Sequence, residues 1–513
     1  MGKGFNWFRW RPFIQGAFLL LFFLLFLQTT YRGRDVIPYP VNLFLRFDPL
    51  ILLTTLLSTH RLPVVLLPAL SVVGLTLLLG RVFCGWICPL GTLNHLLSRL
   101  NRRPRTGPGG FRWKYYILFG LLASSLFTVQ VVGYLDPLSL LIRSLTLAAE
   151  PLWNLAAHSA FSSLYEHGFK ALEPLYAFLR AHLLALRQPL YHQAFAVGVI
   201  FAAVLLLNLL RPRFWCTHLC PLGALLGLVA SLSPLSRRVS PEDCDLCGLC
   251  QRLCPSGAAD SREGLWRKAE CFLCGRCQVL CPSRAVAFGF SLGKGEAVEG
   301  MDLGRRRVLL SLAAGAVLAP LLRLSSLPTR GREGLIRPPG ALPEAEFLRR
   351  CVRCGECMKV CLTGGLQPAL LEAGLEGIWT PVFDFDLGYC QYYCTLCGQV
   401  CPTGAIQELT QAEKAKVKIG LAHIDRSRCI PYSQGVDCIV CEEHCPTPEK
   451  AIKFVLGEVV TPKGPRRVKL PVVDLRLCIG CGICQFKCPL EDKPAIVVTP
   501  LGETRGGAFL LPT

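Results

Sequence analysis

Long apolar runs alternate with polar connections in the first half of the chain, and this pattern predicts membrane helices. Four runs stand out, at residues 13–31, 62–82, 113–132 and 195–210. A helix needs about 20 apolar residues to cross the hydrocarbon core of a bilayer. The first three runs come close to this length, and the fourth reaches it if it extends upstream. We therefore expect four membrane-spanning helices, followed by a more polar second half.

Basic residues around these runs predict the orientation of the helices. Residues 85–114, which follow the second run, contain basic residues and no acidic residue, whereas Asp48 and Asp136 lie in the connections at the opposite ends. Positively charged loops stay in the cytoplasm, so we expect the N-terminus and residues 85–114 to be cytoplasmic. The formal net charge of +20 follows this membrane pattern, and no nucleic-acid partner is expected.

The four expected helices form an internal repeat. FDPLILL at residues 47–53 matches LDPLSLL at 135–141, and RVFCGWICPLG at 81–91 matches RFWCTHLCPLG at 213–223. Two helices per half, both running the same way, make a parallel repeat about an axis along the membrane normal. The second half carries an insertion, roughly residues 143–187, whose amphipathic pattern predicts helices on the outer surface.

The 28 cysteines are the strongest chemical signal in the chain. Most of them fall into sets of three close cysteines and a fourth, usually before proline, which is the ligand pattern of a [4Fe–4S] cluster. Because the fourth cysteine can ligate the cluster of a partner set, Cys254 is expected to serve the second set and Cys281 the first. The six sets are Cys244, Cys247, Cys250 and Cys254; Cys271, Cys274, Cys277 and Cys281; Cys351, Cys354, Cys357 and Cys361; Cys390, Cys394, Cys397 and Cys401; Cys429, Cys438, Cys441 and Cys445; and Cys478, Cys481, Cys484 and Cys488.

Zinc and disulfides are the competing explanations of these sets. Paired C-x-x-C motifs also form tetrahedral zinc sites, but zinc does not account for a repeated fourth cysteine before proline. A disulfide scaffold predicts irregular spacing in a short secreted chain. No C-x-x-C-H motif occurs, so covalently bound haem is not expected. The sets therefore predict six [4Fe–4S] clusters.

The two C-x-x-x-C-P motifs leave Cys84, Cys88, Cys216 and Cys220 outside the six sets. One interpretation is a seventh iron–sulfur cluster shared between the two halves of the repeat. A disulfide or thiol pair and a purely structural role are the other two interpretations. His218, inside the second motif, is a further candidate ligand, although a histidine in such a place more often has a structural hydrogen bond.

These motifs together resemble a known family. Residues 1 to about 300 resemble the NapH-type membrane quinol dehydrogenases, which have four membrane helices, two C-x-x-x-C-P motifs and a cytoplasmic two-cluster ferredoxin. From about residue 304 the chain is similar to NapG, a four-cluster ferredoxin. CVRCGECMKVC, GYCQYYCTLCGQVCPTGAI and CIVCEEHCPTPEKAI carry this likeness. The resemblance implies a fusion of the two proteins.

The fold expected for such a fusion is an α-helical membrane domain joined to α+β domains of the bacterial ferredoxin type. The expected domains are a membrane domain at residues 1–240, a cytoplasmic two-cluster ferredoxin domain at 241–300, a signal or anchor with its linker at 301–342, and a four-cluster ferredoxin domain on the outer side at 343–513.

The segment that joins the two ferredoxin regions resembles an export signal. GRRRVLL at residues 304–310 has the pattern of a twin-arginine signal, and the apolar run at 308–322 is short for a membrane span. No convincing cleavage site follows it, so we expect an anchor, a fifth helix in the cytoplasmic membrane, with the C-terminal region outside. A plain fifth membrane helix, and a buried helix with all the clusters in the cytoplasm, are the alternatives.

The resemblance implies that quinol delivers electrons through the clusters to a reductase or cytochrome in a complex. Asp48 and Asp136 are the candidate proton acceptors, because ionisable groups at membrane depth are usually functional. Asp before Pro is also a good helix N-cap. His60 is a further candidate. The alternative functions are electron flow in reverse, from ferredoxin to quinone, and a maturation factor of the NosR or CcoG type.

Overall fold

The computed structural model describes residues 7–100, 112–167, 172–185, 188, 190–259, 266–290, 303–324, 335–461 and 464–506. The chain forms two compact units, each built from separate segments. Unit 1 comprises Met1–Phe26, Asn42–Ser144 and Ala196–Leu321, and unit 2 comprises Leu27–Val41, Leu145–Phe195 and Leu322–Thr513. Part of the expected cytoplasmic loop, at 101–111, and the expected domain boundary near residue 300 lie outside the described residues.

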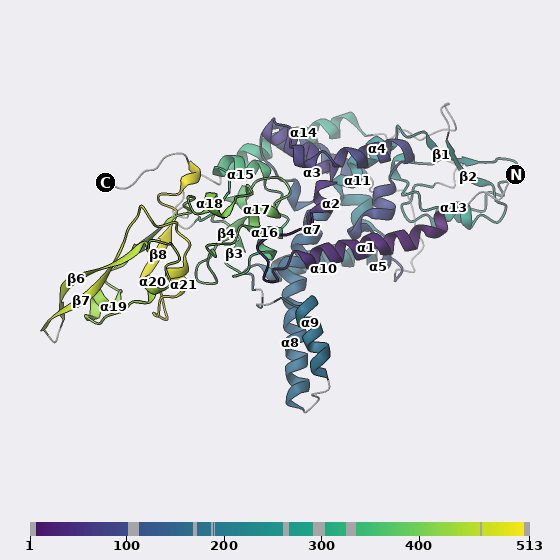
Figure 1. The fold of residues 1–513 in the computed structure, drawn as a ribbon. Coiled ribbons are helices and arrows are strands. Elements are labelled where there is room, and N and C mark those ends of the chain that lie inside the picture. The colour runs from purple at the N-terminus through teal and green to yellow at the C-terminus, as the bar shows by residue number, and fades with distance from the viewer. Residues whose placement is uncertain are drawn as a thin grey trace. The chain divides into compact units, whose positions relative to one another are not determined.

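Unit 1 is a bundle of helices that carries a two-stranded sheet at one end (Figure 1). The antiparallel strands β1 and β2 pair Leu235 with Phe290 at one end and Val239 with Val286 at the other. The elements of this unit are α1 Arg11–Gln28, α2 Leu43–Arg46, α3 Pro49–Thr59, α4 Ala69–Leu79, α5 Pro89–Leu97, α6 Arg112–Leu126, α7 Pro137–Ser144, α10 Ala194–Leu210, α11 Pro221–Ala230, β1 Leu235–Val239, α12 Leu249–Leu253, α13 Arg276–Val279, β2 Val286–Phe290 and α14 Arg305–Leu324.

The same order of elements occurs twice in unit 1, as the repeated motifs predict. Helices α3, α4 and α5 of the first half correspond to α7, α10 and α11 of the second. A single π-helical turn follows α4 at Phe83–Ile87 and α10 at Trp215–Leu219. Proline then occupies the first position of α5 and of α11, where its fixed φ favours a new helix and its missing N–H costs nothing. The Cys-Pro pair therefore ends one element and starts the next.

Two helices of unit 1, α4 and α6, are clearly shorter than the apolar runs that predict them, with 11 and 15 residues. Prolines precede α4, and Gly80, with φ of 81°, ends it. Thr128, with φ of 64°, follows the end of α6. A third helix, α10, has 17 residues and covers the whole run at 195–210. Among the described residues, the segment Phe8–Gln28 alone is long and apolar enough to cross a membrane, so the structure does not confirm four membrane-spanning helices.

Helix α14 coincides with the expected apolar helix after the arginine cluster, and it packs closely on α6. A Cβ atom on Gly315 would overlap with the carbonyl oxygen of Gly120, and Ala123 also lies against it. Small residues let helix backbones approach at such short range. The segment at 308–322 is thus built into the helical bundle of unit 1.

Unit 2 combines a helical hairpin with small antiparallel sheets (Figure 1). Helices α8 and α9 lie within the insertion at residues 143–187, where the amphipathic pattern predicts helices, and the rings of Phe161 and Tyr176 pack between them at 4.9 Å. The elements of this unit are α8 Glu150–Glu166, α9 Glu173–His182, α15 Glu344–Arg350, α16 Glu356–Lys359, β3 Leu366–Pro368, β4 Pro381–Phe383, α17 Leu396–Gln399, α18 Gln411–Lys414, β5 Leu421–Ile424, α19 Ile430–Gln434, α20 Val440–Glu443, β6 Ile452–Thr461, β7 Gly464–Val473, α21 Ile483–Phe486 and β8 Ile496–Thr499.

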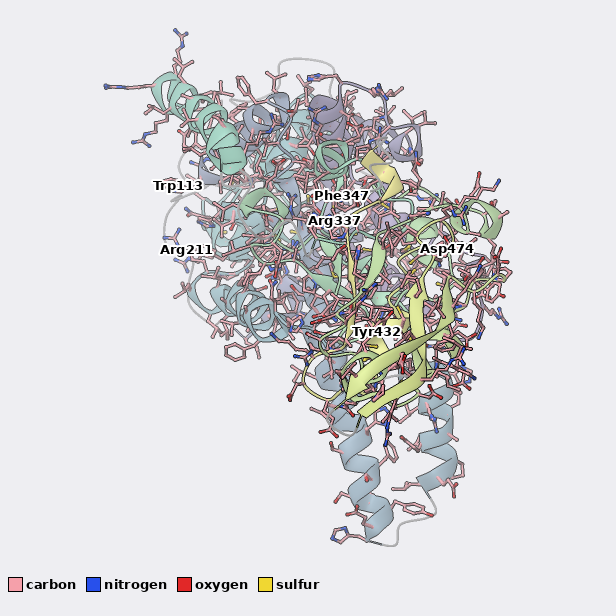
Figure 2. The ribbon with its side chains drawn as sticks, turned by 90° about the vertical axis from the view of Figure 1, so that its left-hand side faces the viewer. Trp113, Arg211, Arg337, Phe347, Tyr432 and Asp474 are labelled. Carbon is pink, nitrogen blue, oxygen red and sulfur yellow. The ribbon has the colours of Figure 1, made fainter. Side chains whose placement is uncertain are left out.

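The core of unit 2 places charged and aromatic side chains together. The guanidinium of Arg337 lies 4.6 Å from the ring centroid of Phe347 (Figure 2) and forms an ion pair of 2.6 Å with Glu344. Further along, β6 and β7 form a long ribbon, and the hydroxyl of Tyr432 donates a hydrogen bond of 3.0 Å to the carbonyl of Pro471 in β7. These contacts anchor the chain around the cysteine loops.

Three modules of one plan hold the six cysteine sets. In the first module, β1 precedes the first set and β2 follows the second. In the second module, Ala341 pairs with Ile406 around the third and fourth sets. In the third module, β5 pairs with β8 around the fifth and sixth sets. The pairs β3–β4 and β6–β7 are insertions between the two sets of their modules.

Candidate iron–sulfur centres

The first module brings together thiols from both of its sets. Cys244, Cys247 and Cys250 line one pocket together with two cysteines of the second set, Cys277 and Cys281, of which Cys281 is the fourth of its set. Cys254 lies beside the second set, since its charge contributes to the raised pKa of Cys271, after the larger effects of burial and of Cys274. This is the exchange of fourth cysteines that the spacing predicts.

The other two modules exchange their fourth cysteines in the same way. One pocket is lined by Cys351, Cys354, Cys357 and Cys401. Another is lined by Cys429, Cys438, Cys441 and Cys488. In the fourth set, Cys390, Cys394 and Cys397 have Cys361 as an electrostatic neighbour. In the sixth set, Cys478 and Cys481 have Cys445 as an electrostatic neighbour. The sequence alone does not predict which sets in this region are partners.

A recurrent backbone turn shapes these loops. The residue two positions after the first cysteine has a positive φ in four sets, at Leu246, Leu273, Arg353 and Gly480, with values of 50°, 49°, 55° and 72°. Left-handed residues alternating with right-handed ones turn successive backbone N–H groups toward one point, which favours an anion there. Three of the four are not glycine, so the loops hold a strained conformation of the kind found at functional sites.

The residues of these pockets have the composition of an iron–sulfur cluster site. Within the part of the chain that the structure describes, no three His, Cys, Asp or Glu side chains lie close enough together to hold one metal ion. Four thiols around a common pocket are instead the ligand set of a [4Fe–4S] cluster. The residues present therefore fit this cofactor.

The four-cysteine group, which we define as Cys84, Cys88, Cys216 and Cys220, comes together from the two halves of the repeat. Cys84 and Cys216 lie in the two π-helical turns, a feature that is frequent at functional sites. Cys88 and Cys220 cap α5 and α11, and their Sγ atoms accept hydrogen bonds from the backbone N–H groups of the following turn. Burial raises the pKa of Cys88, and the nearby thiols of Cys216 and Cys84 raise it further. All four thiols are thus electrostatic neighbours.

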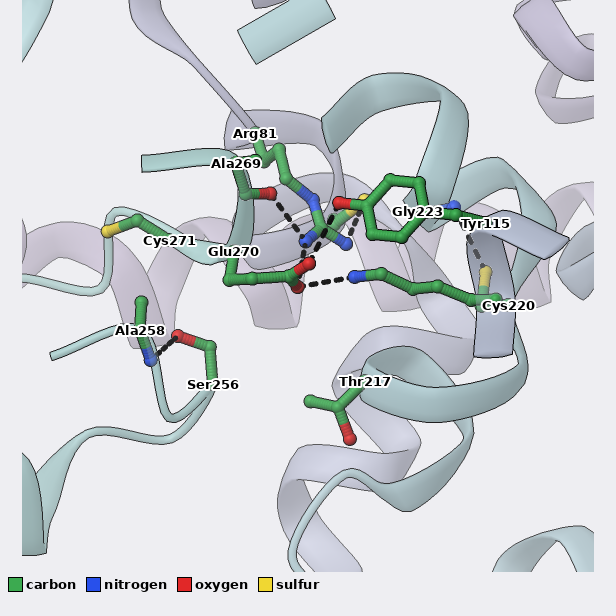
Figure 3. A network of polar contacts seen from close by, with 12 residues as sticks. Arg81, Tyr115, Thr217, Cys220, Gly223, Ser256, Ala258, Ala269, Glu270 and Cys271 are labelled. Carbon is green, nitrogen blue, oxygen red and sulfur yellow. Dashed lines mark hydrogen bonds and ion pairs between the residues drawn. The ribbon is translucent and has the colours of Figure 1, made fainter. Parts of the chain in front are cut away.

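A buried polar network joins this group to the first module (Figure 3). Arg81 donates to Glu270 Oε2 over 3.2 Å and to the carbonyl of Ala269 over 3.0 Å. Lys114 forms an ion pair with the same carboxylate oxygen, and the Tyr115 hydroxyl donates to Oε1 over 2.8 Å. Glu270, which is 3% exposed, directly precedes Cys271. One buried carboxylate therefore links the cysteine repeat to the second set.

The sequence interpretation missed this network, although one signal for it was present. Arginine stands three residues before the first cysteine in both C-x-x-x-C-P motifs, at Arg81 and Arg213. A cation repeated at the same place beside a thiol pair indicates an electrostatic role. Glu270 and Lys114 gave no comparable signal, because their partners are remote in the sequence.

Asp48 and Asp136 meet in the interior of unit 1. Both are fully buried, and the two carboxyl groups are electrostatic neighbours. One oxygen of each, Asp48 Oδ2 and Asp136 Oδ1, has no hydrogen-bond partner among the described residues. Ionisation of one of two neighbouring buried carboxyls opposes ionisation of the other. Asp48 also caps α3, accepting from the N–H of Leu50 over 2.8 Å. Asp48 is also an electrostatic neighbour of Cys88. The sequence predicts the two aspartates at the opposite ends of the membrane helices from the cysteines. Because α3 is a short separate helix, Asp48 and Asp136 are instead not remote from the four-cysteine group.

The two histidine candidates lie apart from this pair. His60 is exposed and caps the opposite end of α3 in a left-handed conformation. His218 stacks on Phe214 at 4.6 Å, and its Nδ1 is 2.7 Å from the hydroxyl of Thr217. Structural contacts therefore account for the position of His218.

Comparisons with known families match the cysteine regions. A model described as a 4Fe–4S dicluster domain matches residues 350–405. Models described as 4Fe–4S binding domains match residues 62–107, 193–240 and 397–421 and residues 237–260. The first two of these ranges contain the two C-x-x-x-C-P motifs. No solved structure is significantly similar to the chain.

These matches and the paired cysteine sets define a polyferredoxin, an electron-transfer protein that binds [4Fe–4S] clusters. The ferredoxin-type protein NapG of Escherichia coli is 36% identical over 211 residues, which cover 40% of this chain and 88% of NapG. The methylamine utilization ferredoxin-type protein MauM of Methylorubrum extorquens is 38% identical over 34% of this chain and 76% of MauM, and MauM of Paracoccus denitrificans is 36% identical over 39% and 86%. The chain belongs to the NapG/MauM family of ferredoxin-type proteins.

Proposed function

We propose that this polyferredoxin is a membrane-bound quinol dehydrogenase of the NapH–NapG type, which passes electrons to a redox partner outside the cytoplasm. One observation carries the proposal: the buried carboxyl pair Asp48 and Asp136, the four-cysteine group and the first ferredoxin module lie within one unit. A donor of both protons and electrons needs a proton acceptor beside an electron acceptor, and quinol is such a donor.

The cysteines hold the cofactors in this proposal. Six groups of four thiolates hold six [4Fe–4S] clusters, with the fourth cysteine exchanged between the two sets of each module. The four-cysteine group holds a seventh. When bound, each cluster accepts and returns one electron, so the two electrons of a quinol must separate. The loops and strand pairs of the modules fix the positions of the thiolates.

The carboxyl pair receives one of the two protons of the quinol, and the second proton passes to water. Asp48 and Asp136 share one proton, and a pair in that state accepts one more before both carboxyls are neutral. Their backbone hydrogen bonds hold the two side chains in place: Asp48 accepts from the N–H of Leu50 over 2.8 Å, and Asp136 from that of Ser139 over 2.7 Å. Burial of the pair limits proton leakage to water.

The segments that make up the two units support the proposed topology. Unit 2 contains the second and third modules and the connections at residues 27–41 and 145–195. The charge pattern predicts that these connections lie outside the cytoplasm. Unit 1 contains the arginine-rich ends and the first module. Lys359 of α16 forms an ion pair with Glu150 of α8, and the Tyr191 hydroxyl donates to the carbonyl of Met358 over 3.2 Å. The second module thus contacts a connection expected on the outer side.

The close packing of α14 on α6 supports the function of α14 as a retained anchor. A cleaved signal would leave Gly120 and Ala123 without their partner Gly315. Replacement of Arg305 and Arg306 by lysine should block export of the second and third modules if the twin-arginine pathway carries them, which a reporter fused to the C-terminus would measure. Active reporter outside the cytoplasm in this variant would exclude the twin-arginine pathway and leave the anchor in place.

A quinol assay on the complete chain tests the proposed function. Asparagine caps a helix as well as aspartate does, so the Asp48→Asn, Asp136→Asn variant should keep its fold and its iron. We expect quinol to reduce its clusters at least about 100-fold more slowly than in the wild type, the usual contribution of a proton acceptor, while dithionite reduces both proteins equally. The matched control is Asp35→Asn, at an exposed position in unit 2. Equal rates with quinol in all three proteins would exclude the carboxyl pair, and no reduction of the wild type would exclude the function.

A further inference from the structure

Two buried arginines share one phenylalanine at the junction of the four-cysteine group and the first module. The guanidinium carbons of Arg81 and Arg213 each lie 4.9 Å from the ring centroid of Phe272. Phe272 is 1% exposed and lies between Cys271 and Cys274 of the second set. A guanidinium over an aromatic face is held there by the quadrupole of the ring. The ring therefore positions one cation from each half of the repeat.

Close backbone contact fixes this junction. A Cβ atom on Gly85, which lies between Cys84 and Cys88, would overlap with the carbonyl oxygen of Phe272. The indole N–H of Trp86 donates to the carbonyl of Leu273 over 3.1 Å. The loop of the second set thus packs directly on the first π-helical turn, and no other residue than glycine fits at position 85.

The two arginines differ in their partners. Arg81 pairs with Glu270 and donates to a backbone carbonyl, as described above. Arg213 is 0% exposed, and none of its three side-chain nitrogen atoms has a hydrogen-bond acceptor among the described residues. An uncompensated charge in the protein interior is strongly unfavourable. The chain therefore leaves a buried cation that requires an anion.

The groups around Arg213 identify where that anion belongs. Its electrostatic neighbours are thiols of the four-cysteine group, Cys216, Cys84 and Cys88, and one thiol of the second set, Cys274. Cysteine thiolates and the cluster that they hold carry a net negative charge. Arg213 thus lies within the electrostatic reach of both candidate centres.

We propose that Arg213 is the counter-charge of the iron–sulfur centre in the four-cysteine group, and that it raises the reduction potential of this centre. The inference rests on the seventh cluster of the proposed function. A fixed positive charge stabilises the reduced, more negative state of a cluster. The Phe272 ring positions the guanidinium of Arg213.

A redox titration of the complete, cluster-loaded chain tests this inference without quinol. Arg213→Gln keeps the approximate size of the side chain and removes its charge. We expect the potential of one centre, followed by electron paramagnetic resonance with dithionite and mediators, to fall by about 59 mV, a tenfold shift against reduction for one electron. Arg213→Lys keeps the charge and should restore at least half of this shift. The matched control is Arg238→Gln, at an exposed arginine of β1 in the same unit.

Each outcome decides the inference. Equal potentials in Arg213→Gln and Arg238→Gln, with equal iron, overturn it. Loss of about four iron atoms in Arg213→Gln, the content of one cluster, supports it if Arg213→Lys keeps the iron and overturns it if the lysine variant loses the iron too. Cys84→Ser without loss of iron also overturns it. If Arg213→Gln shows the shift but the wild type does not oxidise quinol, the proposed function is wrong and this inference stands.

Discussion

Buried cations lie beside cysteine groups in both units, but they are balanced differently. In unit 1, Arg81, Lys114 and Arg213 surround the four-cysteine group, and Glu270 is the carboxylate that pairs with the first two. Arg213 has no hydrogen-bond acceptor among the described residues. Positive charge is therefore in excess around this group.

In unit 2, three cations beside the second module pair with three carboxylates. Arg337 binds Glu344, and Arg505, which is half-buried, binds Glu344 and Glu503, each over 2.7 Å. Lys359, which lies between the last two cysteines of the third set, pairs with Glu150. These pairs join segments of the chain and neutralise one another.

The difference separates charge that supports the fold from charge that awaits a cofactor. A matched buried pair holds two segments together, and removal of either partner leaves the other unpaired. An unmatched buried cation is costly in the protein alone, and it becomes favourable when an anionic group binds beside it. The excess of buried positive charge in unit 1 thus indicates an anionic centre in the four-cysteine group. The clusters of the ferredoxin modules are not this centre, because they have cysteine ligands of their own.

The largest effect should follow from breaking the four-cysteine group. Cys84→Ser should remove about four iron atoms from a total of about 24 to 28 per chain. The double variant Cys84→Ser, Cys220→Ser should lose no more than the single one, because ligands of one centre act together and their effects do not add. Iron analysis of anaerobically purified protein measures both.

The ferredoxin modules supply the control for this comparison. Their spectra should remain unchanged in Cys84→Ser, since no ligand of the six sets is altered. Unchanged iron together with a thiol at Cys88 that reacts with alkylating reagents would favour a disulfide or structural pair. Tightly bound zinc in place of iron in the wild type would contradict the whole assignment.

The next largest effect concerns the buried carboxylate of unit 1. Glu270→Gln removes the partner of Arg81 and Lys114 and leaves two buried cations beside Arg213. We expect a loss of about 3–5 kcal/mol in the free energy of unfolding, the usual result of breaking a buried pair. Thermal unfolding, compared with the exposed Glu413→Gln, measures the loss. A loss as small as that of the control would mean that water reaches the network.

Local patterns in the sequence predict much of this architecture. Apolar runs predict α1, α4, α6 and α10, and the Asp-Pro motif predicts where α3 begins. The spacing within each cysteine set predicts its ligands, because one loop holds three of them. These features depend on residues close together in the chain, and short-range rules apply to them.

The features that the sequence did not reveal depend on contacts between distant residues. Arg81 and Glu270 meet only after the repeat and the first module have folded together, and Asp48 meets Asp136 only through the repeat. The division of the spans was also missed, because hydrophobicity hides single backbone breaks such as Gly80. The pairing of sets within unit 2 needed the strand pairs that flank them.

A smaller effect should appear in unit 2 as the pH falls. Burial opposes ionisation of Glu344, but Arg337 first and then Arg505 lower its pKa to about 2. A carboxyl whose pKa is lowered in the folded state adds stability above its unfolded pKa of about 4.3, and this stability is lost as pH falls toward 2. At about 1.4 kcal/mol per pKa unit, the contribution is at most about 3 kcal/mol.

Acid unfolding of Glu344→Gln tests this assignment. The variant should be less stable than the wild type at pH 7, and the difference should shrink between about pH 4 and pH 2, because protonation removes the same charge from the wild type. A difference that stays constant over this range would show that packing of the side chain, and not its charge, stabilises unit 2.

The smallest effect should come from an exposed pair, which gives the baseline for charge removal in unit 2. Lys453 and Glu449 lie 2.6 Å apart with side chains that are 49% and 68% exposed. Water screens such pairs, so Lys453→Gln should cost about 0.2–1 kcal/mol. Raising the salt from about 0.1 M to 1 M shortens the Debye length from about 10 Å to about 3 Å and should abolish this difference, while the effect of Glu270→Gln should persist. If salt removed both effects alike, the charges around the four-cysteine group would be accessible to ions, and their excess would no longer indicate a buried anionic centre.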